Sequence, residues 1–246
     1  MGKFSYKPNK DKVKNKINKL NNRNSKSDLL WKPDSGTQLV RILPYVHNEG
    51  LSPFIELMFH YDIPGKNWIS PASDPIGEYD PIQEFALQVK NSGGNWDIFK
   101  ATMPKKRTYA PVLVRGEEEK GIRFWGFGKT VYNEFLQYQD DPDYETFADP
   151  YEGMDLKINY TTADDSNTNY AKTDVLLRPK TTPALDDIEK LDELIENQPD
   201  IVDVFDIPDP ETLEDILREY QKAGFDKDEY QRRARMKALG KDPDAP

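Results

Sequence analysis

The strongest constraint on the fold is a series of short segments in which apolar and polar residues alternate, each bounded by turn-forming residues. Because successive side chains of a strand point to opposite faces, this alternation predicts strands that bury one face only. Short strands with few helices between them favour an antiparallel barrel or sandwich. The six predicted strands are residues 37–43, 54–61, 108–114, 121–127, 155–160 and 173–178.

Helices are predicted at two positions within this β-rich part and at three positions beyond it. The first two are expected to pack against the strands, and proline or glycine separates the last three. The fold class is therefore mainly β with added helices, that is, α+β. The predicted helices are residues 81–90, 130–138, 185–197, 210–223 and 227–239.

Charge divides the chain into three zones. The net charge is −10, yet residues 1–26 carry nine Lys/Arg and one acid, Asp11, a net of +8. Residues 186–246 carry nineteen Asp/Glu and nine Lys/Arg, a net of −10. Segregated charge is typical of proteins that handle nucleic acids, although two solvated tails are the simpler interpretation of charge alone. The predicted domains are a flexible basic arm (1–28), a β-rich core (29–183) and an acidic helical region (184–246).

The basic arm is predicted to be neither a secretion signal nor a membrane anchor. Its lysines are not followed by an apolar stretch, and no apolar run in the chain approaches the roughly 18 residues of a membrane span. Val13, Ile17 and Leu20 recur at helical spacing, so part of the arm can form a short amphipathic helix. The chain lacks cysteine, which excludes disulfides and makes a reducing cytoplasm the expected location.

The sequence contains few of the residues and motifs that catalytic sites require. His47 and His60 are the two histidines, and no nucleophile elbow is present. The acidic run at 140–145 lacks the regular ligand spacing and the glycine of a calcium loop, so a solvated loop is the better interpretation. We therefore expect no enzymatic activity and no cofactor.

The residues most typical of a binding site lie between positions 96 and 129. In the second predicted hairpin strand, Arg123, Trp125 and Phe127 share one face, a combination that does not suit a closed core. It suits single-stranded nucleic acid, because bases stack on rings while phosphates bind Lys and Arg. Alternatively, Trp125 and Phe127 fill the core and Arg123 lies at a strand end. With Tyr170 from the polar loop 161–172, the predicted contacts are Phe99, Lys105, Lys106, Arg107, Tyr109, Arg123, Trp125, Phe127, Lys129 and Tyr170.

Several segments in the middle of the chain resemble, in their order and spacing, the helix-destabilising single-stranded-DNA-binding protein of T4-like bacteriophages. The resemblance spans roughly residues 36–180. Each segment is short, and their shared order carries the similarity. The segments are TQLVRILP at 37–44, GEYD at 77–80, KKRTY at 105–109, VLV at 112–114, FWGFGK at 124–129 and PYEGMDLK at 150–157.

The resemblance implies an OB-fold core that binds single-stranded DNA. It also implies that the basic arm mediates self-association along DNA, and that the acidic C-terminal region recruits replication or recombination proteins. Residues 105–108 match the basic-then-hydroxyl motif of the family, and Trp125 falls where the family places a base-stacking aromatic. Phe99 and Tyr170 are looser matches.

Two departures from the family pattern matter. The family's type member holds a structural zinc through one histidine and three cysteines, whereas this chain has His60 but Ala72, Ile82 and Phe85 at the cysteine positions. Zinc is therefore not expected, and apolar packing is the expected replacement. The arm also lacks the compact basic-hydroxyl motif of the family, since its charges are spread from Lys3 to Lys26.

The resulting functional prediction is cooperative, sequence-nonspecific binding of single-stranded DNA during phage replication, recombination and repair. Two alternatives stay open. An OB-fold RNA-binding or translational-control module would use the same rings and cations, because only contacts to the 2′-hydroxyl separate RNA from DNA. The second alternative, an acidic structural scaffold, would need neither the aromatic rings nor the cations.

Overall fold

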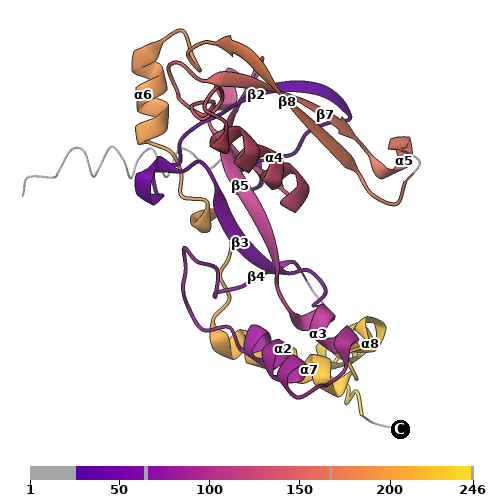
Figure 1. Ribbon diagram of the computed structural model, residues 1–246. Coiled ribbons are helices and arrows are strands. Elements are labelled where there is room, and N and C mark those ends of the chain that lie inside the picture. The colour runs from indigo at the N-terminus through magenta and orange to yellow at the C-terminus, as the bar shows by residue number, and fades with distance from the viewer. Residues whose placement is uncertain (1–25, 64–65, 167, 245–246) are drawn as a thin grey trace, which may run out of the picture.

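The computed structural model describes residues 26–63, 66–166 and 168–244, and within them the chain forms an eight-stranded sheet and seven α-helices (Figure 1). The mixed α+β class is confirmed. Each of the six predicted strands is present, and two short strands join them. The strands are β1 (Leu30–Trp31), β2 (Gly36–Ile42), β3 (Ile55–His60), β4 (Trp68–Ile69), β5 (Lys105–Val114), β6 (Arg123–Phe127), β7 (Met154–Thr161) and β8 (Lys172–Thr181).

The five predicted helices are present with shifts of a few residues at their ends. The short helices α3 and α5 were not predicted. Asp80, Asp187, Asp209 and Asp226 each accept a hydrogen bond from a backbone N–H in the first turn of the helix that follows, which is the usual cap of an N-terminus. The helices are α2 (Pro81–Asn91), α3 (Trp96–Thr102), α4 (Lys129–Asp140), α5 (Ala163–Ser166), α6 (Ile188–Glu196), α7 (Pro210–Lys222) and α8 (Lys227–Ala238).

The sheet is open. Its strands follow the order β1-β6-β5-β2-β7-β8, with β3 paired to β5 and β4 paired to β3. All the pairs are antiparallel except β1 with β6. The edge strands β1 and β8 do not pair with each other, so the closed barrel expected from the sequence is not confirmed.

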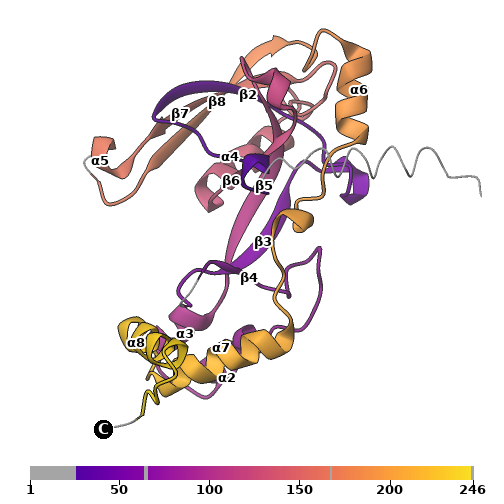
Figure 2. The same ribbon diagram turned by 180° about the vertical axis from the view of Figure 1, so that it is seen from behind.

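Strand β5 connects two lobes. Its second half pairs with β2 and β6 in the upper lobe, which also holds β7, β8, α4 and α6 (Figure 1). Its first half pairs with β3 and leads down to a lower lobe of α2, α3, α7 and α8 (Figures 1 and 2). We call the narrow region around the paired strands β3 and β5 the waist. The two lobes are thus joined through the paired strands β3 and β5.

Both faces of the upper sheet are covered. Helix α4 covers one face, where Phe135 packs against Trp125 and Phe127. On the other face Leu191 of α6 joins a cluster with Leu113 of β5. Strand β6 and residues 108–114 of β5 are therefore buried on both sides.

The acidic C-terminal region contributes to the body of the protein. Leu213, Leu217 and Tyr220 of α7 are buried in a cluster with Ile63 and Ile82. Burying side chains of this size contributes about 1.5–3 kcal/mol each. Helix α7 therefore builds the lower lobe together with α2, whereas α6 of the same region packs in the upper lobe.

A buried polar cluster joins β3 to the start of α2. The ring nitrogens of His60 lie 2.9 Å from the backbone oxygen of Thr102 and 2.8 Å from a carboxylate oxygen of Asp80. Ser70 also donates to Asp80, and Asp80 caps α2. Burial alone would raise the pKa of Asp80, but the bonds from His60 and Ser70 outweigh it and hold the pKa below its ordinary value.

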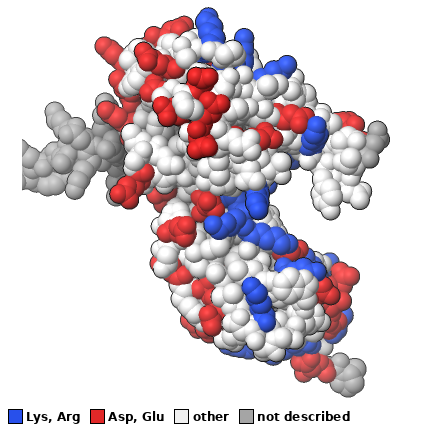
Figure 3. Space-filling view, viewed as in Figure 1, with Lys and Arg blue, Asp and Glu red and all other residues white. Residues whose placement is uncertain are grey.

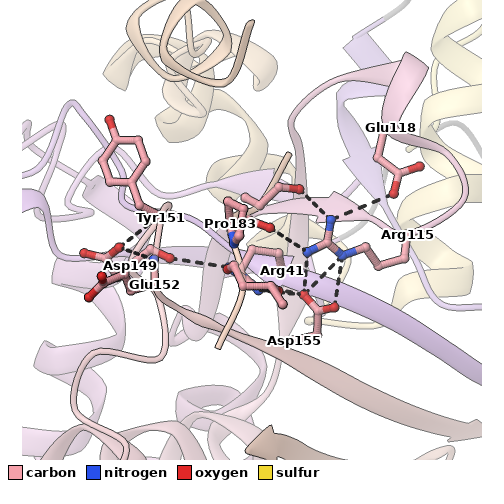
Figure 4. Close-up of polar contacts among 10 residues, drawn as sticks. Arg41, Arg115, Glu118, Asp149, Tyr151, Glu152, Asp155 and Pro183 are labelled. Atoms are coloured by element: carbon pink, nitrogen blue, oxygen red, sulfur yellow. Dashed lines mark hydrogen bonds and ion pairs between the residues drawn. The ribbon is translucent and has the colours of Figure 1, made fainter. Parts of the chain in front are cut away.

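An arginine pair shares one carboxylate at one end of the neighbouring strands β5, β2 and β7 (Figure 4). Arg41 Nε and Arg115 Nη2 donate to the same oxygen of Asp155, at 3.1 and 2.7 Å. Arg41 is fully buried, which lowers its pKa although Asp155 opposes the shift. Its remaining N–H groups reach Thr182, at 2.7 Å for the backbone oxygen and 2.9 Å for the hydroxyl. Strands β2, β5 and β7 are thereby tied to the segment that follows β8.

We expect Asp155→Ala to lower the free energy of unfolding by about 3 kcal/mol, because it leaves the buried Arg41 without its counter-charge. Urea unfolding measures the change. Asp174→Ala is the matched control, since Asp174 forms an exposed pair with Lys172 and its loss should cost less than about 1 kcal/mol. Equal midpoints for the two variants would contradict the assignment of Asp155 as the anchor.

Candidate nucleic-acid interface

Three consecutive cations mark the start of β5 at the waist. Lys105 and Lys106 are exposed and Arg107 is half-buried. The alternation of a strand places Lys106 on one face and Lys105 with Arg107 on the other. On the surface, Lys and Arg side chains gather at the waist, beside a hollow beneath the projecting edge of the upper lobe (Figure 3). The predicted basic run therefore lies where a ligand can reach it.

Each of the two exposed lysines already has a carboxylate partner. Lys105 pairs with Asp62, and Lys106 Nζ lies 2.7 Å from Glu56. The bond from Lys105 is the main reason that the pKa of Asp62 is lowered, and the bond to Glu56 raises the pKa of Lys106. Exposed pairs of this kind contribute about 0–1 kcal/mol, so a phosphate can replace either carboxylate at little cost.

Arg107 and Lys129 differ in how far contacts within the protein occupy their side chains. Arg107 Nη2 donates to the backbone oxygen of Gly126 at 2.6 Å, so part of its guanidinium is occupied within the protein. Lys129 begins α4 and is exposed. Lys129 therefore adds a cation at the upper margin of the waist, while Arg107 contributes mainly through its charge.

Four predicted contacts are buried: Tyr109, Arg123, Trp125 and Phe127. The expectation that the last three form an open face is wrong, and the structure shows the alternative, in which Trp125 and Phe127 fill the core and Arg123 lies at the start of its strand. Trp125 is 2% exposed, packing against Trp31 and Phe135 with ring centroids 5.8 and 5.9 Å away. Phe127 lies in the same core. The predicted sharing of one face holds, but α4 covers that face. Burial on both sides of β6 leaves no ring of this strand free to stack on a base.

Tyr109 and Arg123 are also withdrawn from solvent. Tyr109 is 9% exposed in a cluster with Ile55 and Phe59, and its burial raises its pKa. Arg123 is equally buried, and its Nη2 lies 2.5 Å from Glu117. Neither side chain is positioned to meet a ligand.

Exposed aromatic rings occur on both sides of the waist. Tyr170, at the end of the β7–β8 hairpin, is 79% exposed. On α3, Trp96 is 57% exposed and its ring lies 4.7 Å from that of the half-buried Phe99. Lys90 Nζ stands 5.7 Å from the Phe99 ring. The hairpin end and α3 lie on the same side of β5, above and below the waist (Figure 1).

Trp96 was not predicted as a contact, although it is the first residue of the stretch 96–129 in which most of the contacts were predicted. The sequence did contain a signal for its exposure. Asn95 caps α3 by accepting bonds from Asp97 and Ile98, so Trp96 is the first residue of a short helix. The exposed aromatic of this region is therefore Trp96 rather than Trp125.

The positions that the resemblance aligns with zinc ligands make other contacts in this protein. His60 bonds to Asp80 and Thr102, Ile82 is buried, and Phe85 stacks on Phe225 at 5.7 Å. Across residues 26–63, 66–166 and 168–244, no three His, Asp or Glu side chains gather as a metal site would require. The absence of zinc stays a prediction.

Comparison with known proteins adds no identification, since no protein-family model and no curated protein matches the chain. The geometry of the waist and its rings is therefore the main basis for a functional proposal.

None of the helices in the described part of the chain is long and apolar enough to cross a membrane.

We expect Asp62→Asn to raise the affinity for a single-stranded oligonucleotide by up to about fivefold, because it removes the anion that competes for Lys105. Fluorescence anisotropy with a labelled oligonucleotide measures the change. Asp215→Asn is the control, because Asp215 pairs with Arg218 on α7 and alters the net charge equally. If both variants gain equally, net charge rather than Lys105 explains the effect.

Proposed function

We propose that this protein binds single-stranded DNA without sequence preference and performs no chemistry on it. The observation that carries the proposal is the placement of exposed cations at the waist between two exposed aromatic sites, Tyr170 above and Trp96 with Phe99 below. Bases of a single strand stack on such rings, at about 1–3 kcal/mol each, while the cations hold the backbone.

The same arrangement explains the expected lack of sequence preference. Every base offers a face to an aromatic ring, and Lys binds phosphate as a point charge without reading base edges. A duplex keeps its base faces stacked inside, so it can use the cations but not the rings. Preference for the single strand over the duplex follows from the rings.

The strand connectivity supports an OB-like interpretation of the upper lobe. Strand β2 pairs with β5 and β7, β5 pairs with β6, and α4 lies between β6 and β7 in the chain. OB-folds are partly open five-stranded barrels that bind oligonucleotides. We assign β2, β5, β6, β7 and β8 to that arrangement, opened between β6 and β8.

Self-association along DNA through the basic arm is part of the proposal. Residues 1–25 of the arm lie outside the described residues, but the described part offers a surface that suits a basic segment. A hollow of about 770 Å³ in the upper lobe has apolar walls that include Val46, Leu51 and Ile195. Acids at its margin include Glu145 and Glu196. Opposite charge and the apolar walls both favour an arm with a net charge of +8 and the spaced Val13, Ile17 and Leu20.

Roles in replication, recombination and repair of phage DNA, with recruitment of the corresponding proteins by the acidic C-terminal region, complete the proposal. The family resemblance supports these roles. In the described part of that region, residues 186–226 carry fifteen Asp/Glu and three Lys/Arg. Such a surface attracts basic partner segments and repels duplex DNA at low salt.

Tryptophan fluorescence tests the proposed binding directly. Trp31 and Trp125 are buried and Trp68 is half-buried, so we expect single-stranded DNA to quench mainly Trp96. Trp96→Phe should lose most of the quenching while keeping the affinity, because phenylalanine still stacks. Trp96→Ala should also weaken binding by about 1–3 kcal/mol.

Trp31→Phe is the control for this experiment, since it removes a buried indole and should leave the quenching unchanged. Trp96→Ala protein that binds as tightly as wild type would contradict the stacking role. Equal quenching by RNA would favour the RNA-binding alternative. Failure of wild-type protein to bind any nucleic acid would favour the scaffold.

The arm is tested by deletion of residues 1–26. We expect the affinity for an oligonucleotide that holds one protein to change little, and the sigmoidal onset on long single strands to disappear. Glu145→Gln with Glu196→Gln should reproduce the second effect if the hollow receives the arm. Glu78→Gln with Glu84→Gln on the lower lobe is the control. Equal weakening on short and long DNA would show that the arm binds phosphates instead.

A further inference from the structure

Charge reverses sign within the acidic C-terminal region. Residues 186–226 have a net charge of −12, from fifteen Asp/Glu and three Lys/Arg. Residues 227–241, which contain α8, carry six Lys/Arg and two Asp/Glu, a net of +4. The reversal falls at the turn between α7 and α8, so the last helix has the opposite electrostatic character from those that precede it.

Helix α8 begins at the candidate interface. Lys227, its first residue, has Nζ 3.4 Å from one oxygen of Asp62, and the other oxygen of Asp62 accepts from Lys105. One carboxylate therefore bridges the waist cation and the first cation of α8. From that point the twelve residues of α8 extend about 18 Å, at about 1.5 Å per residue.

One side of α8 is occupied by contacts within the protein. Tyr230 packs on Tyr220 at 6.1 Å, and Lys237 pairs with Glu219 of α7. Arg233 is buried, and its Nη1 lies 2.6 Å from Asp244. These contacts fix the orientation of the helix about its axis.

The opposite side of α8 is open and basic. Gln231, Arg232, Arg235 and Met236 line a shallow hollow of about 430 Å³, and Asp228 of the first turn is the one acid in its lining. Arg232 pairs with Glu229 of the preceding turn, at 2.7 Å. Arg235 is exposed, and in the described part of the chain no carboxylate pairs with it. The open side therefore presents two guanidinium groups on successive turns, and Arg235 is the freer of them.

We propose that the open side of α8 is a second backbone-binding segment, on which Arg232 and Arg235 bind phosphates of the strand that leaves the waist past Lys105. The inference rests on the proposed function and extends it by naming the path of the strand across the lower lobe. The observation behind the inference is that the basic side chains of the waist and of α8 are neighbours, because Lys105 and Lys227 both pair with Asp62 at the start of the helix. Residues 186–226 are strongly acidic, so α8 is the part of the C-terminal region whose charge suits phosphate binding.

Arg232→Gln with Arg235→Gln, made in the full chain, tests the proposal. Labelled oligothymidylates from about 4 to about 16 nucleotides cover the site sizes of OB-folds. We expect the variant to match wild type on the shortest strands, which occupy the waist alone, and to bind the longer ones more weakly. Its salt slope on the longer strands should fall by about 0.7 for the lost contact of the freer Arg235, and by less for that of Arg232, which is paired with Glu229.

Arg218→Gln with Lys222→Gln on α7 is the matched control, with the same change in charge in the same lobe. Circular dichroism and thermal unfolding verify that both variants are folded. The inference is overturned if the α8 variant binds long strands like wild type, or if the control loses affinity equally. If wild-type protein binds none of the strands, the proposed function itself fails, an outcome distinct from failure at α8 alone.

Discussion

The carboxylate of Asp155, shared by Arg41 and Arg115, fixes the frame on which the rest of the structure depends. It connects β2, β5 and β7 at one end of these neighbouring strands, and Arg41 continues the connection to Thr182 beyond β8. A buried guanidinium is costly unless its donors are satisfied. Here the donors of Arg41 are satisfied by Asp155, by the backbone oxygen of Asp149 and by Thr182, so the cluster specifies how β2 lies relative to β7 and to the segment after β8.

From this frame β5 leads to the waist and positions its cations. The residues of β5 next to Arg115 pair with β2, and those at its beginning pair with β3. Because β3 ends at His60, which bonds to Asp80 at the start of α2, the same strand pair also orients the lower lobe. Tyr170 and Trp96 belong to different lobes, so the separation of the two rings depends on this rigid connection.

Much of the fold could be predicted from the sequence, but less of the site could. Alternation located the strands, and caps and prolines located the helices, because both signals are local. Trp125 was assigned to an open face because alternation reports which residues share a face and not whether a distant helix covers it; that helix is α4. Lys105 and Lys106 were placed correctly on the surface, since a lysine rarely tolerates burial. The link between Asp62 and Lys227 joins residues 165 positions apart, a distance that no local pattern can bridge.

The internal pairing of the waist lysines has a consequence for ion exchange. A polyanion that binds free lysines releases one condensed cation for nearly every phosphate that it neutralises. When a phosphate displaces Asp62 or Glu56, the freed carboxylate takes up a cation from solution in return. Net ion release is then smaller than the number of phosphates held. The number of phosphate contacts derived from a salt titration alone would therefore be lower than the number of phosphates that this surface binds.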